Sequence, residues 1–398
     1  MLKSFLGRWI KADQRPGLIF IIFMAKFSLP AVRKNILSFA KGVIFFASTV
    51  CLAVLLCVSL EFILSLHRPI SERSHTRYDA QLGWVNILNT TIRDFYQPGA
   101  SLTINSQGLR NGYDFPARIP DGRMRIMCSG DSFTLGSGVG DEDTWPQQLA
   151  QLDPRFETVN LGQGGYGIDQ SFLLYRREGV KLQHHLHIFA VIYDDFTRMS
   201  KDKFLGVYGK PVIQLENDQI KVKNVPVPQS AYSTPWLAEN LAQARSLVSV
   251  QIVKGVLRFI APGARSKIES RKSFPSLNLV LRVFEDLNQT EQEMNSDFLL
   301  VYLPTRADLE WEPLAAAALK QKRSLLGRKL AQRGIVFIDL VEDFEKFDDA
   351  QLNRLFIPEN KFPFSAGHYS KEGNRYVAQL IYRKLFALAD ANKTMNSR

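Results

Sequence analysis

The chain has 398 residues, 45% of them hydrophobic, which is enough for one domain with a proper core and a further segment. Its formal net charge is +11, but residues 1–41 alone hold eight Lys/Arg and a single acidic residue, Asp13. Residues 67–398 therefore carry a net charge of only +5. This mildly basic balance excludes the charge footprint of a nucleic-acid-binding protein, and no nucleic-acid partner is expected.

An apolar stretch follows the basic N-terminal residues. Residues 42–66 contain one charged side chain, Glu61, and a helix of about 20 apolar residues crosses a bilayer. The alternative, a cleaved signal peptide, has a shorter apolar region and a small-residue cleavage site, which the following residues do not offer. We therefore expect one transmembrane helix over 42–66, preceded by a basic cytoplasmic segment over 1–41. The expected protein is single-pass in the cell inner membrane, and its main domain is periplasmic.

Short apolar runs alternate with helical patterns beyond a polar tether and a preamble of loops with a small hairpin, expected over residues 67–120. The expected strands are 125–128, 157–161, 188–193, 298–303 and 335–340, and the expected helices are 144–152, 170–177, 314–333 and 369–388. Strands that alternate with helices imply a parallel sheet that is covered on both faces.

About a hundred residues separate the third expected strand from the fourth. Residues 211–227 alternate like a hairpin that turns near Asn217 and Asp218. Two helical stretches follow, around 237–260 and 277–295. We interpret about 200–295 as a cap-like insertion within a domain that spans residues 121–390.

The carboxyl ends of the strands are where active sites form in an open parallel sheet. Ser132 follows the first expected strand and Asp194 the third, and His368 stands beyond the fifth, after a loop. A serine needs a base to become a nucleophile at neutral pH. His368 is the one histidine at this end of the sheet, so it is the candidate base for Ser132.

Three other histidines, His184, His185 and His187, precede the third expected strand, at the opposite end of the sheet. Their spacing could suggest a metal cluster. No acidic or cysteine ligand accompanies them in the sequence, so we expect a solvated loop, no metal site and no cofactor.

Three sequence blocks stand in order at these strand ends. They are GDSFTLG at 130–136, NLG at 160–162 with GYG at 165–167, and HYSKEGN at 368–374. Together they resemble the blocks of the SGNH, or GDSL-type, serine hydrolases. Residues 82–110 are also similar to the preamble of bacterial envelope members, and the resemblance covers about 78–390.

The resemblance implies both a fold and a set of site residues. The fold would be a flavodoxin-like, three-layer α/β/α sandwich with a five-stranded parallel sheet, preceded here by one N-terminal transmembrane helix. Ser132 would be the nucleophile and His368 the base. The backbone N–H groups of Ser132 and Gly162 would bind the oxyanion.

The chain departs from this family at the position of an asparagine that donates to the oxyanion. Asp194 stands there, and an ionised carboxylate cannot donate and would repel the developing negative charge. Either Asp194 is protonated and completes the oxyanion hole, or it turns away and the N–H groups of Ser132 and Gly162 suffice.

A second departure concerns the partner of the histidine. The family has an aspartate two or three residues before it, where this chain has Ala366 and Ser365. A backbone carbonyl, Ser365 or a residue from another loop could orient His368 instead. We therefore expect a Ser–His dyad.

The expected function is serine-dependent hydrolysis of acyl esters, such as O-acetyl esters, at the cell envelope. The partner would be an acylated small molecule, glycan or lipid. One alternative is O-acyl transfer to an envelope glycan by the same residues, which depends on how well water is excluded. Another is a non-catalytic, glycan-binding relative that keeps the fold.

Overall fold

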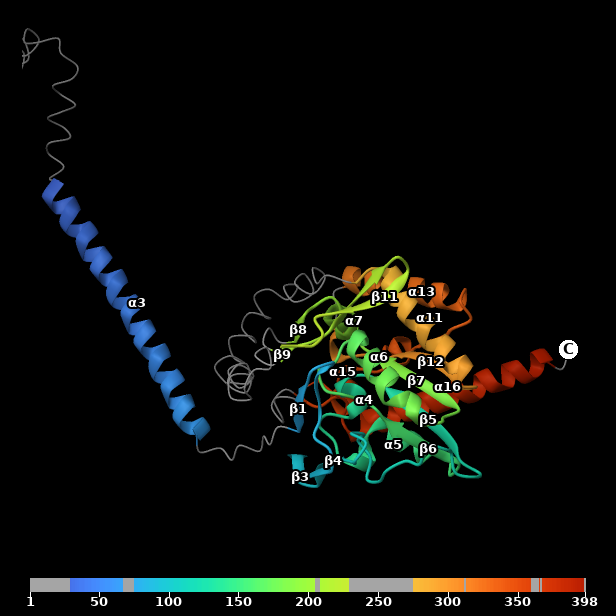
Figure 1. Ribbon diagram of the computed structural model, residues 1–398. Coiled ribbons are helices and arrows are strands. Elements are labelled where there is room, and N and C mark those ends of the chain that lie inside the picture. The colour runs from blue at the N-terminus through green and yellow to red at the C-terminus, as the bar shows by residue number, and fades with distance from the viewer. Residues whose placement is uncertain are drawn as a thin grey trace, which may run out of the picture. The chain divides into compact units, whose positions relative to one another are not determined.

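The computed structural model describes residues 29–66, 75–204, 208–228, 275–310, 313–358, 365 and 367–396. The chain divides into one unit that ends at Ile70 and a second that begins at Ser71. The described part of the first unit is the helix α3 (Leu29–Leu66) (Figure 1). Within α3, Leu37–Leu56 is long and apolar enough to cross a membrane, by length and composition. The span expected at 42–66 therefore lies on one continuous helix.

The second unit is built on a five-stranded parallel sheet in the order β13-β12-β7-β5-β6. Its strands are β5 (Met124–Ser129), β6 (Phe156–Asn160), β7 (Leu186–Val191), β12 (Asp297–Tyr302) and β13 (Val336–Asp339). This order is that of a flavodoxin-like, doubly wound sheet. The predicted fold class is confirmed, and each expected strand is present.

The third strand ends two residues earlier than expected, at Val191. Helix α7 (Tyr193–Met199) begins there, because the Asp195 carboxylate accepts a hydrogen bond of 2.9 Å from the N–H of Ile192 and caps the helix. Tyr193 and Asp194 therefore belong to the first turn of a helix.

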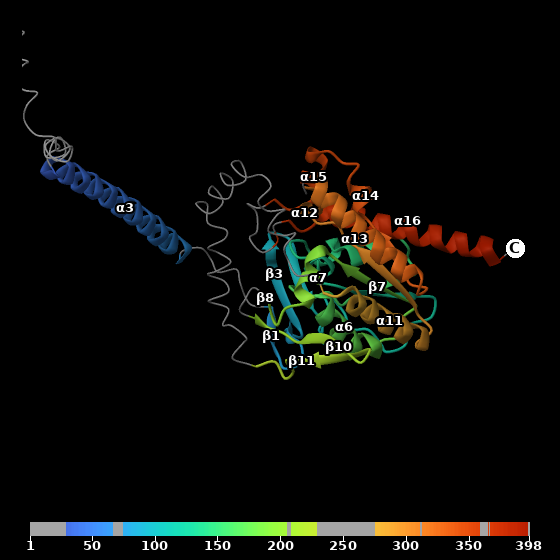
Figure 2. The ribbon, with the colours of Figure 1, turned by 90° about the horizontal axis from the view of Figure 1, so that it is seen from above.

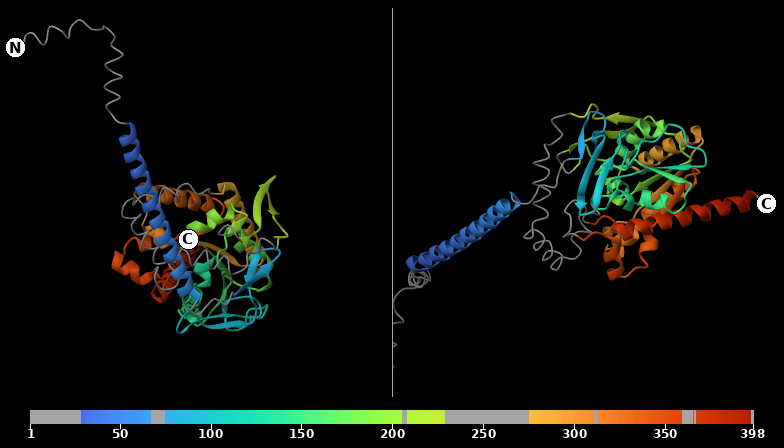
Figure 3. Two further views of the ribbon diagram at one scale, coloured as in Figure 1. Left: turned by 90° about the vertical axis from the view of Figure 1, so that its left-hand side faces the viewer. Right: turned by 90° about the horizontal axis from the view of Figure 1, so that it is seen from below.

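Helices cover both faces of the sheet (Figure 2). One face packs against α6 (Ile168–Arg177), α11 (Leu277–Glu293) and α13 (Pro313–Ala331), and the other against α5 (Trp145–Ala150) and α16 (Lys371–Asn396). Alternation along β5 explains the two cores: Met127 is buried in the first, and Ile126 and Cys128 in the second. Helix α16 continues beyond the sheet toward the C-terminus, as the right-hand view of Figure 3 shows.

The preamble forms two hairpins where one was expected. Strands β1 (Thr76–Asp79) and β2 (Gly83–Asn86) pair antiparallel, and so do β3 (Thr90–Gln97) and β4 (Ala100–Ile104). Trp84 and Val85 of β2 are buried in the core on one face of the sheet, whereas the apolar side chains of β3 and β4 form a small cluster of their own.

The expected insertion contains the short strands β8 (Lys203–Phe204) and β9 (Tyr208–Gly209), then the predicted hairpin, formed by β10 (Val212–Glu216) and β11 (Gln219–Lys223). Asn217 and Asp218 make its turn, both with positive φ. The helix expected at 237–260 lies outside the described residues. Helix α11 packs on the sheet, where Phe284 is buried among core residues, so this end of the insertion belongs to a layer of the sandwich.

Candidate active site

The turn after β5 presents Ser132 at the carboxyl end of the sheet. Gly130 has a φ of 156°, and a Cβ there would lie 2.2 Å from Thr134 Oγ1. Asp131 caps the short helix α4 (Ser132–Leu135) by accepting a hydrogen bond of 2.8 Å from Phe133 N–H. Ser132 is the first residue of α4, so its N–H has no acceptor within the helix and points outward from the helix start.

His368 lies against this turn. Its Nε2 is 2.8 Å from Ser132 Oγ, and its ring packs on Phe133 with centroids 4.6 Å apart. Backbone bonds hold the residue from both sides: its N–H donates to Ser365 O at 3.0 Å, and its carbonyl accepts from Ile357 N–H at 2.8 Å. The fold thus brings the two predicted side chains within hydrogen-bond distance, as a serine–base pair requires.

The loop after β6 lies alongside this turn, with Asn160 as its anchor. The Asn160 side chain donates to Thr134 O at 2.9 Å and accepts from Gly162 N–H at 3.0 Å. A Cβ on Gly162 would lie 2.1 Å from Leu135 N, so this glycine is needed for close packing on α4. The Gly162 N–H would have to leave Asn160 in order to reach an oxyanion.

Two further backbone donors stand in the same loop. Within the described part of the chain, the N–H groups of Gly164 and Gly165 make no hydrogen bond. Gly165 has a φ of 77° and packs on the Phe204 ring, where a Cβ would lie 2.6 Å from a ring carbon. The sequence pattern did not distinguish these glycines from Gly162, because it shows the need for glycine and not the direction of each N–H.

Asp194 is half-buried in the first turn of α7, where a helix N-terminus favours negative charge. The capping carboxylate of this turn belongs to its neighbour Asp195, which is buried. Burial and the charge of Asp131 raise the pKa of Asp195 well above its ordinary value.

The expectation of a solvated loop for His184 and His187 is wrong. His187 lies inside β7, and both imidazoles are buried around Glu291 of α11. Glu291 Oε1 is 2.7 Å from His187 Nδ1, and Glu291 Oε2 is 2.8 Å from His184 Nε2. His187 Nε2 then lies 2.7 Å from Ser129 Oγ, at the end of β5.

No local pattern predicts this network, because Glu291 stands more than a hundred positions after the histidines. His185 alone remains exposed. Among the described residues, no group of three or more His, Cys, Asp or Glu side chains is arranged to hold a metal ion. The polar atoms of the network bond one another instead.

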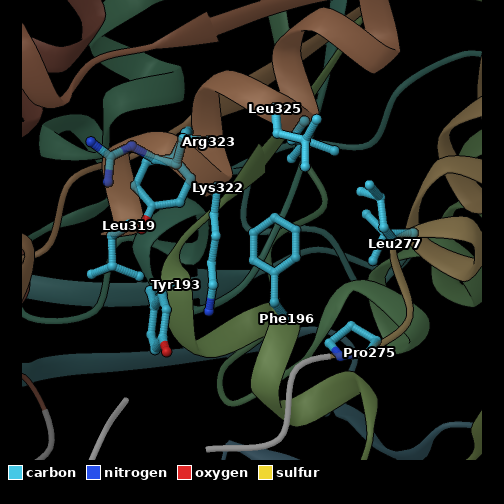
Figure 4. A pocket seen from close by; sticks show the side chains of 11 residues that line it. Tyr193, Phe196, Pro275, Leu277, Leu319, Lys322, Arg323 and Leu325 are labelled. Carbon is cyan, nitrogen blue, oxygen red and sulfur yellow. The ribbon is translucent and has the colours of Figure 1, made fainter. Parts of the chain in front are cut away.

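An apolar cavity of about 200 Å³ lies between α7, α11 and α13. Tyr193 and Phe196 of α7 face Leu277 of α11 and Leu319 of α13 across it, and Lys322 extends into the same space (Figure 4). Tyr193 follows β7, so part of the cavity wall lies at the edge of the sheet that carries Ser132.

No protein-family model matches the chain, and no curated protein matches its sequence. Among solved structures it is similar to the acetyl xylan esterase AlAXEase, at 13% identity and a TM-score of 0.39, over 66% of this chain and 99% of that one. It is also similar to a member of the lipolytic G-D-S-L family from Veillonella parvula, at 13% identity and a TM-score of 0.34, over 64% and 94%. A lipase/acylhydrolase from Enterococcus faecalis matches at 10% identity and a TM-score of 0.34, over 66% and 95%.

Proposed function

We propose that this protein is a serine ester hydrolase of the SGNH type. The observation that carries the proposal is the distance of 2.8 Å between His368 Nε2 and Ser132 Oγ, at the carboxyl end of a parallel sheet. A serine hydroxyl that donates to an imidazole can lose its proton as it attacks a carbonyl. The order and spacing of the three sequence blocks support the same assignment.

The reaction takes place in two halves. Ser132 Oγ attacks the ester carbonyl while His368 Nε2 takes its proton, and the imidazolium then returns that proton to the leaving alcohol. An acyl-Ser132 ester remains. His368 next takes a proton from a water molecule, whose oxygen attacks the acyl carbon, and the protonated imidazole restores the Ser132 hydroxyl as the acid leaves.

The oxyanion of each tetrahedral intermediate needs donors on the side away from His368. The Ser132 N–H at the start of α4 is the first donor in this proposal. Gly162 N–H joins it after release from Asn160, or the N–H of Gly164 or Gly165 does so without breaking a bond. Asp194 takes part only in a protonated form, since an ionised carboxylate would oppose the oxyanion.

His368 works in a Ser–His dyad in this proposal. The sequence places no carboxylate in the five residues before it. The two backbone hydrogen bonds of His368, to Ser365 and Ile357, and its contact with Phe133 support the orientation of the ring.

Helix α3 places the domain at a membrane in this proposal. Its apolar span and the basic residues before it favour a single-pass anchor with the domain outside the cytoplasm. Acylated small molecules, glycans or lipids of the envelope, O-acetyl esters among them, would be the substrates.

A serine-directed probe tests the proposal on the full chain in detergent. A fluorophosphonate should label the wild type and not Ser132→Ala, and hydrolysis of p-nitrophenyl acetate should be lost in the same variant. Thr134→Ala, two residues along the same turn, checks that loss of a hydroxyl alone does not cause the effect. A folded wild type that is neither labelled nor active would contradict hydrolysis and favour a binding module.

A further inference from the structure

Helix α7 carries a charged side chain, Arg198, that reaches the turn after β5. This turn, residues 130–135, carries Ser132 and is called the nucleophile turn below. Arg198 Nη1 lies 2.9 Å from Asp131 Oδ2, 2.8 Å from Asp195 Oδ1 and 3.0 Å from Tyr166 O. Asp131 follows β5, Tyr166 follows β6 and Asp195 follows β7. One guanidinium nitrogen therefore joins the three segments that form this edge of the sheet.

The cluster is buried, so its charges matter. The side chains of Asp131 and Asp195 are 2% and 3% exposed, and that of Arg198 is 18% exposed. Burial alone would lower the pKa of Arg198, but the two carboxylates raise it, and Arg198 stays cationic. Burial and the charge of Asp131 raise the pKa of Asp195, so Arg198 chiefly balances the buried charge of Asp131. Loss of this cation would leave that charge uncompensated, which is costly in a protein interior.

The guanidinium also lies over the Phe204 ring, 5.4 Å from its centroid. That ring packs on Gly165 in the loop after β6. Arg198 is thus fixed both by its charge partners and by an aromatic contact.

Asp131 links this cluster to the nucleophile. Its Oδ2, which accepts from Arg198, is also 3.3 Å from Ser132 Oγ. The Ser132 hydroxyl has one proton and two neighbouring acceptors, Asp131 Oδ2 and His368 Nε2. A carboxylate without a cation would attract that proton strongly, and a hydroxyl bonded to it would point away from the base.

We infer that Arg198 is a positioning residue, whose charge occupies Asp131 and directs the Ser132 hydroxyl to His368. This inference rests on the proposed function, since it concerns the serine that attacks. Arg198 acts through Asp131 and contacts no reacting atom.

The geometry predicts which substitution restores the effect. All three polar contacts of Arg198 converge on Nη1, and a lysine ammonium is a compact charge with three donors. Lysine should therefore replace this arginine in large part. Methionine keeps the apolar stem and removes the charge, so it separates packing from electrostatics.

The test compares Arg198→Met, Arg198→Lys and the control Arg176→Met in the full chain in detergent. Arg176 of α6 makes a partly exposed ion pair with Asp286 of α11. The readouts are the rate of Ser132 labelling by a fluorophosphonate, kcat and KM for p-nitrophenyl acetate, and the unfolding midpoint.

Arg198→Met should lose about 10² in labelling rate and in kcat with little change in KM, as a displaced catalytic group does. Arg198→Lys should recover most of this loss, and Arg176→Met should match the wild type. In Asp131→Asn/Arg198→Met the competing carboxylate is absent, and the labelling rate should rise above that of Arg198→Met. Asparagine still caps α4 in this variant.

Two results would overturn the inference: a folded Arg198→Met that is labelled as fast as the wild type, or a lysine variant and a double variant that are both as slow as Arg198→Met. If Arg198→Met does not fold, the lysine and double variants decide by the same comparison with the wild type. A wild type that is not labelled at all contradicts the proposed function itself, which distinguishes the two failures.

Discussion

His368 Nε2 meets Ser132 Oγ at 2.8 Å although 236 positions separate the two residues in the chain. An isolated antiparallel bridge between Phe356 and Tyr369 holds the residue next to His368 in place. The Tyr369 hydroxyl then donates to Pro304 O at 2.6 Å, beyond the end of β12. Contacts outside the loop of His368 therefore help to position the candidate dyad.

Replacement of His368 by alanine should reduce kcat for p-nitrophenyl acetate by about 10²–10⁴, since general base catalysis contributes this much. The unfolding midpoint should change little, because the ring lies at the surface of the nucleophile turn. His185→Ala is the matched control, since His185 is exposed at the other end of the sheet. A His368→Ala protein with activity within threefold of the wild type would show that another group takes the proton.

The five strands and the place of Ser132 could be predicted from the sequence, because buried parallel strands are continuous apolar runs and their carboxyl ends share one edge. The end of β7 could not be predicted, because the apolar run continues through Ile192 and Tyr193 into a helix that Asp195 caps. Apolar runs do not distinguish a buried strand from the first turn of a buried helix.

The partners of the buried charged side chains could not be predicted from the sequence. Glu291 meets His184 and His187, and Arg198 meets Asp131, only through tertiary contacts. The histidines were expected in solvent because no acidic residue stands near them in the sequence. Partners of buried ionisable groups are found across elements, where local spacing carries no information.

The Glu291 network should make the domain sensitive to acid. Burial lowers the pKa of His187 against the pull of Glu291. Burial would raise the pKa of Glu291, yet the two imidazoles hold it well below its ordinary value. The unfolded chain therefore takes up protons below about pH 6.5 at His187, and below about pH 4.5 at Glu291, that the folded chain resists. Both groups lower the free energy of unfolding as the pH falls, which denaturant titrations at pH 7.5, 5.5 and 4.5 would measure.

Glu291→Gln tests the same network at constant pH. Glu291 hydrogen-bonds two buried imidazoles, and a partner lost from such a buried network costs about 1–3 kcal/mol. Glu285→Gln, on the same helix, breaks a half-exposed ion pair with Arg333 and should cost about 1 kcal/mol or less. Equal stabilities of the two variants in urea would mean that the buried carboxylate is not needed by the imidazoles.

Arg110 should not tolerate lysine, in contrast to Arg198. It is buried, and its three nitrogens donate to Asp141 and to the carbonyls of Leu135, Gly136 and Val139 in the segment after α4. An ammonium has too few donors for this set, and each buried acceptor left unsatisfied costs about 1–3 kcal/mol. Arg110→Lys should therefore lose at least about 2 kcal/mol of unfolding free energy, whereas exposed Arg123→Lys should lose almost none. A lysine variant as stable as the wild type would contradict the need for the guanidinium fork.

The membrane topology is tested in whole cells. We expect protease added to spheroplasts to digest the domain that carries Ser132, because the basic residues before the apolar span of α3 favour the cytoplasm. A cytoplasmic marker protein must survive the same treatment. A domain that stays intact until the membrane is lysed would contradict the proposed orientation.

The proposed role of Asp194 concerns the way in which the oxyanion is held. A second unit charge about 4 Å from the oxyanion would repel it by roughly 4 kcal/mol at an effective dielectric of 20. That repulsion would offset the roughly 3–4 kcal/mol that one oxyanion donor supplies, so we predict that Asp194 lies near the Ser132 pocket without being an ionised partner of the oxyanion.

Asp194→Asn distinguishes the possible roles. If the side chain faces the oxyanion, the amide supplies a donor and should maintain or raise kcat for p-nitrophenyl acetate. If Asp194 serves only the start of α7, asparagine should keep the unfolding midpoint and leave kcat nearly unchanged. Asp202→Asn, on an exposed turn after α7, is the control for loss of a nearby charge. A folded Asp194→Asn with a severe loss of activity would refute both readings, because it would mean that the reaction requires this carboxylate in its ionised form.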